Sequence, residues 1–219
     1  MEAGANPDGC GVASPRLRME AGGRQLHTLR RERWLDPASR NAWVSAPDWA
    51  AKGTVISDVE VRAAGAKGRG VFARRAFARG EFIFRRRHRI IVDGRGIAGL
   101  SAQDQRHLCE LGWDRYAVLH PPGCYLNHSC DPNAMRSGVR VFAWKPIRAG
   151  EEITTDYRLN AFDGNSWPCD CGSSVCTGKV AGSFFALPAE RQRAYLRYAP
   201  AFIRHEYHRR GRGQPPRTR

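Results

Sequence analysis

The sequence lacks any run of about 18 apolar residues, and no apolar stretch follows a basic one near its first residues. The first absence argues against a membrane-spanning helix, and the second against a secretory signal peptide. No internal repeat is present either, which argues against a solenoid fold. We therefore expect an intracellular, soluble protein, in the cytoplasm or the nucleus, with no membrane partner. In a reducing compartment, clustered cysteines indicate a metal site rather than disulfides.

Lysine is scarce as well, because only Lys52, Lys67, Lys145 and Lys179 stand among the 36 basic residues. The remaining basic residues are arginines, and the 219-residue chain carries a formal net charge of +15. Arginine makes bidentate contacts with carboxylate and phosphate groups, so the basic ends of the chain could bind a nucleic acid or an acidic partner. A solvated charged surface explains the same composition, and both interpretations stay open.

Composition changes along the chain and suggests its organisation. Residues 1–50 are rich in Gly, Pro, Ala and Arg, which predicts a flexible basic N-terminal extension. Residues 54–158 read as a folded domain, and residues 159–180 hold a cluster of cysteines. We expect a C-terminal helix within residues 181–203 and a disordered basic tail over residues 204–219.

Short segments with β-strand character dominate the central part, which predicts a mainly β fold, more fully a β-rich α+β domain. The expected strands are 55–61, 70–74, 81–86, 116–119, 139–144 and 153–155. We expect 70–74 and 81–86 to be joined across Ala78-Arg79-Gly80. Two helices are expected. The first runs from a cap at Ser101 to Gly112 and includes Cys109, and the second is opened by Pro188 and runs to about Tyr198.

A glycine turn is the first candidate site, with the sequence Lys67-Gly68-Arg69-Gly70. Glycine tolerates a positive φ and lets a ligand approach the backbone closely. Two glycines in a turn are also common without any function, and the longer glycine pattern of phosphate-binding loops is missing. The turn alone is therefore compatible with an ordinary bend and with a ligand contact.

Two later segments also stand out, 125–133 (YLNHSCDPN) and 150–157 (GEEITTDY). In the first, His128 and Cys130 could share a face only if the chain is extended there, so the spacing alone does not decide between a metal pair and a simple turn. In the second, Tyr157 follows a short strand, where a tyrosine is most often packed against its neighbours.

Three of the seven cysteines, Cys169, Cys171 and Cys176, have the spacing C-x-C-x4-C. Three thiolates are one short of the tetrahedral set that structural zinc prefers. The alternative is a loop with three cysteines, with or without a disulfide, but the intervening Gly172 and Ser173 suit a tight metal-binding turn.

Taken together and in this order, these segments resemble the SET-domain lysine methyltransferases with a post-SET zinc segment. The resemblance covers about residues 54 to 178. It implies a SET-type fold of small curved sheets with a knot-like threaded active site and a zinc-bound post-SET loop. It also implies a methyl transfer from S-adenosylmethionine to the side-chain amine of a lysine in a protein substrate, a histone or another basic protein. Nothing in the sequence indicates the oligomeric state.

The resemblance assigns roles to individual residues. Cofactor contacts would come from Lys67, Gly68, Arg69, Gly70, Asn127, His128 and Tyr157. Tyr157 would also be the catalytic residue, orienting the amine and polarising the methyl group. The structural zinc ion would be held by Cys130, Cys169, Cys171 and Cys176. Phe162 and Trp167 are candidates for a wall of the lysine channel, with ordinary packing as the alternative.

The chain departs from the family pattern at two places. The residue two before the tyrosine, usually Phe or Tyr, is Thr155, and a smaller residue there implies room for more than one methyl group. The strand after the glycine turn reads FIFRRRH over residues 82–88 and lacks the tyrosine that many SET domains have there. The alternative to an enzyme is a basic, zinc-containing module of degenerate SET fold that binds nucleic acid or chromatin.

Overall fold

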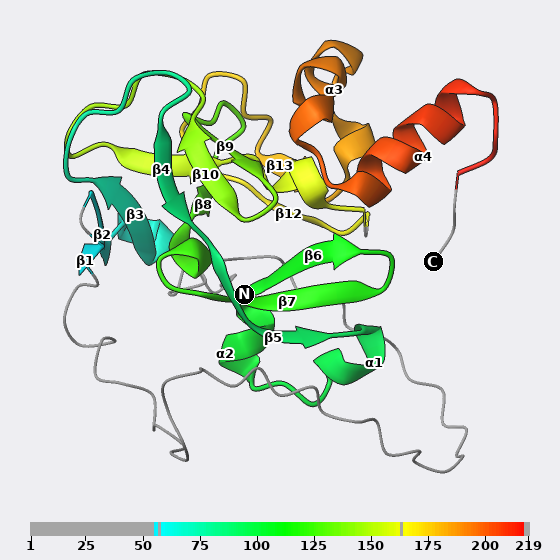
Figure 1. Cartoon of the computed structure of the whole chain (residues 1–219), viewed down its shortest axis with the longest axis horizontal. Coiled ribbons are helices and arrows are strands. Elements are labelled where there is room, and N and C mark those ends of the chain that lie inside the picture. Colours follow the sequence, from blue (N-terminus) through cyan, green and yellow to red (C-terminus); the bar gives the residue numbers. More distant parts are fainter. Residues whose placement is uncertain (1–54, 57, 163, 217–219) are drawn as a thin grey trace.

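The computed structural model of the protein describes residues 55–56, 58–162 and 164–216. The expected extension over residues 1–50 lies outside this part. Several small sheets, rather than one large one, form the described part, and short helices flank them (Figure 1). The expectation of a mainly β, β-rich α+β fold is thereby confirmed. The knot-like threading stays a prediction.

The largest sheet carries the residues of the candidate site. Its strands follow the order β1 (Val55–Ile56), β2 (Val59–Ala63), β3 (Arg69–Ala73), β11 (Glu152–Thr155) and β8 (Asn127–His128). The pairs along it are antiparallel except the last, in which β11 and β8 run parallel, with Thr154 opposite Asn127 and Thr155 opposite His128. This pairing sets the 125–133 segment beside the 150–157 segment.

The remaining sheets are smaller. One has the order β4 (Phe82–Arg85), β10 (Arg140–Ala143), β9 (Ala134–Ser137). Another has the order β5 (Arg87–Val92), β7 (Arg115–His120), β6 (Leu108–Gly112), and the helices α1 (Gly94–Ile97) and α2 (Ala102–Arg106) lie next to it (Figure 1). A two-stranded ribbon pairs β12 (Ser166–Pro168) with β13 (Lys179–Ala181).

Alternation along the strands builds the main core. Val59 and Val61 on β2 point the same way and are almost fully buried, as are Val71 on β3 and Ile153 on β11. Side chains two apart share a face of a strand, so this spacing buries one face of the sheet. The β-branched residues also suit the pleated backbone.

A second core lies under the C-terminal helices α3 (Ala189–Tyr195) and α4 (Ala201–Gly211), which sit together at one end of the molecule (Figure 1). Phe184 and Ile203 are completely buried in it, each worth about 1.5–3 kcal/mol of hydrophobic stabilisation. The short 3-10 turn η5 (Phe184–Ala186) precedes α3, and a second one, η6 (Leu196–Tyr198), lies between α3 and α4. Within the described residues, none of the helices has the length and apolar character needed to cross a bilayer.

The prediction of one helix from Ser101 to Gly112 is wrong beyond its first turns. Ser101 does cap the helix, since its hydroxyl accepts a hydrogen bond from the Asp104 N–H at 3.1 Å. The helix ends at Arg106, and residues 108–112 form strand β6 instead. Pairing with β7 buries the side chains of Leu108 and Cys109 and gives their backbone groups hydrogen-bond partners. A helix would have buried an apolar stripe of only two residues, Leu108 and Leu111.

The prediction of a disordered tail from residue 204 is wrong up to Gly211, because α4 runs through it. The reason is Glu206, whose side chain is fully buried and accepts hydrogen bonds from Arg209 Nε at 2.9 Å and Arg210 Nε at 2.8 Å. A paired buried carboxylate and apolar contacts from Phe202 and Ile203 fix a segment whose composition is polar. The helix expected after Pro188 is present as α3 and η6.

The strands expected at 70–74 and 81–86 exist as β3 and β4, but they do not form a hairpin. β3 pairs with β2 and β11, while β4 pairs with β10. The connection containing Ala78 and Gly80 turns the chain into a different sheet, where the Gly80 N–H donates to Ala143 O at 2.7 Å.

Candidate functional site

The glycine turn enters the site at the start of β3. A 3-10 turn, η2 (Gly65–Lys67), leads into Gly68, whose φ of 76° favours glycine over any residue with a side chain. Gly70 is excluded from carrying a side chain for a different reason: a Cβ there would lie 2.7 Å from Glu152 Oε1 and 3.2 Å from Asn127 Nδ2. Glycine is therefore required at the two positions for separate physical reasons: a positive φ at Gly68 and close packing at the buried Gly70.

Asn127, on β8, ties this turn to the centre of the domain. Its side-chain amide donates to Arg69 O at 3.0 Å and to Glu152 Oε1 at 2.7 Å, and the residue is 3% exposed. Lys67 forms an ion pair with the other carboxylate oxygen of Glu152. The predicted cofactor residues of the turn and of β8 are thus brought together around one carboxylate.

Sequence reasoning missed Glu152. It singled out the Gly-Glu-Glu segment at residues 150–152 but gave the carboxylate no role. A signal was available, because a buried amide and a lysine on separate segments both need an acceptor.

His128 connects Tyr157 to Cys130. Its Nδ1 accepts a hydrogen bond from the Tyr157 N–H at 3.1 Å, and its Nε2 lies 3.3 Å from Cys130 Sγ. Burial lowers the pKa of His128 to about 4, so the ring is neutral at pH 7. With Nδ1 accepting, the single ring proton sits on Nε2 and points at the sulfur. The 3.8 Å approach of Nδ1 to Asp156 is then no ion pair.

Tyr157 begins the 3-10 turn η4 (Tyr157–Asn160), directly after β11. Its hydroxyl donates to Leu126 O at 2.8 Å, and its ring centre lies 5.3 Å from that of His128. The ring of Trp167 approaches both, at 6.3 Å from Tyr157 and 6.5 Å from His128. Phe162 instead packs on Trp113 at 4.5 Å, in the second core. Of the two channel-wall candidates, only Trp167 lies beside Tyr157.

The four cysteines predicted as ligands come together. The sulfur atoms of Cys130, Cys169, Cys171 and Cys176 all lie within 4.8 Å of one another. A tetrahedral zinc ion with Zn–S bonds of about 2.3 Å requires sulfurs about 3.8 Å apart, close to the 4.0 Å between Cys130 and Cys169. Burial and the neighbouring sulfurs raise the pKa of the Cys130 thiol, and a cation between the sulfurs would reverse this effect. The donor set fits zinc.

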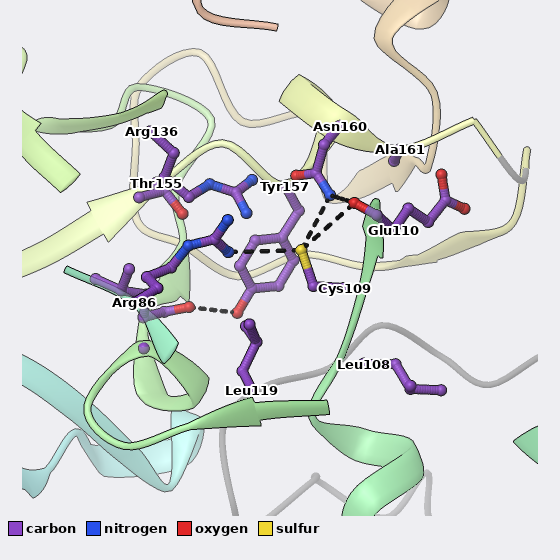
Figure 2. A pocket seen from close by; sticks show the side chains of 12 residues that line it. Arg86, Leu108, Cys109, Glu110, Leu119, Arg136, Thr155, Tyr157, Asn160 and Ala161 are labelled. Atoms are coloured by element: carbon purple, nitrogen blue, oxygen red, sulfur yellow. Dashed lines mark hydrogen bonds between the residues drawn. The ribbon is translucent and has the colours of Figure 1, made fainter. Parts of the chain in front are cut away.

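Tyr157 also lines a cavity, with about 470 Å³ of empty space that includes its mouth. Figure 2 shows its lining side chains converging on the tyrosine. The lining residues are Arg86, Leu108, Cys109, Glu110, Leu119, Gly123, Leu126, Arg136, Thr155, Tyr157, Asn160 and Ala161. Of these lining residues, only Thr155 and Tyr157 were given a role from the sequence. The others were missed, because sequence spacing gives no hint that Arg86 and Arg136 are buried.

Comparison with known proteins identifies the class. Residues 68–158 match the family model described as SET domain. These residues therefore form a SET domain, and the chain is similar to the SET-domain lysine methyltransferases. Three of the four clustered cysteines, Cys169, Cys171 and Cys176, follow the SET domain, in the order expected of a post-SET zinc segment, while Cys130 lies within it.

The similar proteins are histone-lysine N-methyltransferases. A Candida albicans protein described as H3 lysine-36 specific is 30% identical over 142 residues, which are 58% of this chain and 17% of the relative. The Drosophila melanogaster protein Set2 is 39% identical over 66 residues, 26% of this chain and 3% of the relative. The solved methyltransferase domain of human histone-lysine N-methyltransferase SETMAR is 22% identical, with a TM-score of 0.44 over 56% of this chain and 57% of that one. The chain thus spans less than a fifth of these curated relatives.

Proposed function

We propose that the protein transfers a methyl group from S-adenosylmethionine to the side-chain amine of a lysine in a protein substrate. The observation that carries this proposal is the convergence of the glycine turn, Asn127 and Tyr157 at the end of β11, from segments far apart in sequence. The match of residues 68–158 to the SET domain supports it.

The cofactor contacts would come from the turn Lys67-Gly68-Arg69-Gly70 and from Asn127, His128 and Tyr157. When bound, S-adenosylmethionine supplies an electrophilic methyl group. The turn is partly exposed from Lys67 to Arg69, and the lack of a side chain at Gly68 would let a ligand approach its main chain closely. Asn127 holds Arg69 O in place, so it orients the turn.

The substrate amine must arrive neutral, because a lysine ammonium, with a pKa of about 10.4, has no lone pair to attack with. Removing the amine from water favours its neutral form. Tyr157 would orient that amine, and its own hydroxyl is held by Leu126 O. The protein contributes orientation and a cavity that excludes water, rather than a strong base.

Thr155 is the residue that we assign to the number of methyl groups transferred. Its side chain lines the cavity and is 1% exposed. A threonine leaves more room than an aromatic ring, so dimethyl- and trimethyl-lysine are expected among the products. In a Thr155→Tyr variant, mass spectrometry should show a shift toward monomethyl-lysine. An active variant with an unchanged distribution would remove Thr155 from this role.

One structural zinc ion would be bound by Cys130, Cys169, Cys171 and Cys176. Four thiolates leave no open position on a tetrahedral zinc ion, so the metal would hold the fold and take no part in the chemistry. The proton on His128 Nε2 would then form a hydrogen bond to a zinc-bound thiolate, which links the metal site to Tyr157 through the His128 ring.

The substrate class follows from the relatives: a histone or another basic protein, met in the nucleus or the cytoplasm. To test the activity, the full chain is incubated with labelled S-adenosylmethionine and a panel of histones and other proteins, and the modified lysine is mapped. Tyr157→Phe serves as the inactive control. A zinc-loaded protein that shows no cofactor binding in calorimetry would contradict the enzymatic function.

The alternative function is that of a basic module that binds nucleic acid or chromatin. The net charge of +15 favours this alternative. Phosphate contacts release counterions, so such binding should weaken steeply as salt rises. Because α4 is packed up to Gly211, the informative deletion removes residues 212–219 only. Unchanged DNA and RNA binding by this deletion variant, and by a full-length chain with Arg212, Arg217 and Arg219 replaced by Gln, would show that this tail is a solvated end.

A further inference from the structure

Cys109 lies in the cavity beside Tyr157 and belongs to no metal site. It is on β6, 7% exposed, and its sulfur receives two N–H donors: Arg86 Nη1 at 3.5 Å and Asn160 Nδ2 at 3.3 Å (Figure 2). A neutral thiol is a weak acceptor, so two donors, one of them charged, favour the thiolate. As a thiol, the group would have only Glu110 O at 3.6 Å to donate to.

The same cavity contains polar atoms that the described residues leave unmatched. Arg86 is 6% and Arg136 7% exposed, and the Nε of each is buried without a hydrogen-bond partner in the described part of the chain. Thr155 lines the same cavity, and its Oγ1 is also buried without a hydrogen-bond partner among the described residues. Buried donors without acceptors are rare and indicate a partner from outside the chain. A water molecule or an ion can be that partner, and the two guanidinium charges favour an anion.

Charges of both signs act on the sulfur, since Glu110 raises the pKa of Cys109 while Arg86 and Arg136 lower it. Burial by itself would raise the pKa of Cys109, but the charges of Arg86 and Arg136 outweigh it, so that the pKa lies below its ordinary value. Burial lowers the pKa of Arg136 to about 10, which still leaves it charged at pH 7. The other titratable groups of the cavity are held elsewhere: Glu110 accepts from the Phe162 N–H at 2.8 Å, and the Tyr157 hydroxyl donates to Leu126 O.

We propose that Cys109 is a nucleophilic thiolate and that its cavity is a covalent modification site for small electrophiles that carry an anionic group. In the step itself, a lone pair on Sγ forms an S–C bond to an electrophilic carbon while the bond from that carbon to its leaving group breaks. The leaving group departs with the electron pair. The carboxylate of the electrophile lies against the Arg86 and Arg136 guanidinium groups. The bound group then fills the cavity through which a substrate lysine would approach Tyr157.

The test uses the full chain purified with zinc and two alkylating reagents of similar size, iodoacetate and iodoacetamide. Labelling is mapped by peptide mass spectrometry, which separates Cys109 from the other cysteines. Cys124, 1% exposed in η3 (Gly123–Tyr125), is the internal reference for a buried inert thiol. We expect Cys109 to be labelled with a pH midpoint below the ordinary value of about 8.5 for a free thiol, and Cys124 to stay unlabelled.

The variants separate charge from structure. Arg86→Met should slow labelling of Cys109 about tenfold at pH 7, because loss of a nearby cation raises a thiol pKa by about one unit or more. Arg85→Met, the neighbouring exposed arginine at the end of β4, should leave the rate unchanged. In the wild type, the rate ratio of iodoacetate to iodoacetamide should exceed that of free glutathione in the same buffer, and Arg136→Met should reduce it.

Two results would overturn the proposal. One is labelling of Cys109 no faster than of Cys124 at any pH up to about 8.5. The other is a reagent ratio equal to that of glutathione, which would remove the anionic preference. The site does not depend on the proposed activity: carboxymethylation should leave the affinity for S-adenosylmethionine unchanged, and it should abolish methyl transfer where transfer is present.

Discussion

The glycine-turn side of the site and its cavity side, which Tyr157 lines, are built on different principles. On the side of the glycine turn, the polar groups are matched: Asn127 and Lys67 both reach Glu152, and Gly70 leaves space for them. On the cavity side, Arg86 and Arg136 keep buried Nε atoms without partners in the described part. The matched side also follows the SET pattern in sequence, whereas the cavity side departs from it. We infer that the first side is preorganised for one fixed ligand, while the second is completed only when its ligand binds.

Removal of one zinc ligand should break the matched side most severely. Cys171→Ser leaves three thiolates, and the protein should lose its one equivalent of zinc in metal analysis. Zinc binding contributes about 10 kcal/mol or more to the folding of small zinc peptides, so we expect a large fall in the unfolding temperature and loss of cofactor binding. Cys124→Ser, outside the cluster, is the matched control. Full zinc content in Cys130→Ser would show that the ligand set is different.

Tyr157→Phe tests the boundary between the two sides. The change keeps the ring and removes the hydroxyl that donates to Leu126 O. Misplacement of the amine should lower methyl transfer by about a hundredfold, while the dissociation constant for S-adenosylmethionine stays within about a factor of two. Activity is followed with labelled cofactor and affinity by calorimetry. Tyr198→Phe, on η6, should change neither; retained activity in Tyr157→Phe would assign the chemistry to another group.

Asn127→Ala acts on the matched side alone. It removes the donor to Arg69 O and to Glu152 and leaves buried acceptors unmatched, at a cost of about 1–3 kcal/mol. Binding of S-adenosylmethionine should weaken about ten- to hundredfold in calorimetry. Asn160→Ala removes an amide from the cavity side and should leave this affinity unchanged. If both variants bind equally well, the distinction between the two sides is wrong.

The smallest effect is expected from Thr155→Val on the cavity side. Valine keeps the shape of the side chain and removes a buried hydroxyl that has no partner among the described residues. The free energy of unfolding without ligand should rise by about 1 kcal/mol, measured by urea denaturation. Ser129→Ala is the contrasting variant, since its hydroxyl accepts from the Asp131 N–H at 3.1 Å and its loss should destabilise. A destabilised Thr155→Val would mean that the hydroxyl is satisfied in solution.

Most of the matched side could be predicted, because its residues are close together in sequence within each motif; Glu152, the partner of Asn127 and Lys67, could not. The spacing of Cys169, Cys171 and Cys176 indicates a metal loop, and the resemblance supplied Cys130 as the fourth ligand. The parallel pairing of β11 with β8, which brings these segments together, has no signature in the sequence. That the two segments contribute to one site was implied only by the resemblance to SET domains.

The cavity side could not be predicted, since burial of an arginine is decided by tertiary structure. Arg86 looks like one member of a solvated basic run over residues 85–89, yet it is 6% exposed. Cys109 was expected on a helix and lies on β6. The same limit applies to α4, where burial of Phe202, Ile203 and the paired carboxylate of Glu206 fixes a segment of mostly polar composition.

The parallel pairing of β8 with β11 also governs the order in which the molecule can fold. Its partners Asn127 and Thr154 are 154 − 127 = 27 positions apart, whereas β9 and β10 meet across a tight turn. Closing the longer loop costs more chain entropy, so local hairpins form first and this contact later. In a variant that keeps Trp167 as its single tryptophan, the ring of Trp167, 6.3 Å from Tyr157, should report the late step by its fluorescence in stopped-flow refolding. A newly made chain would acquire its scaffold before it acquires a working site.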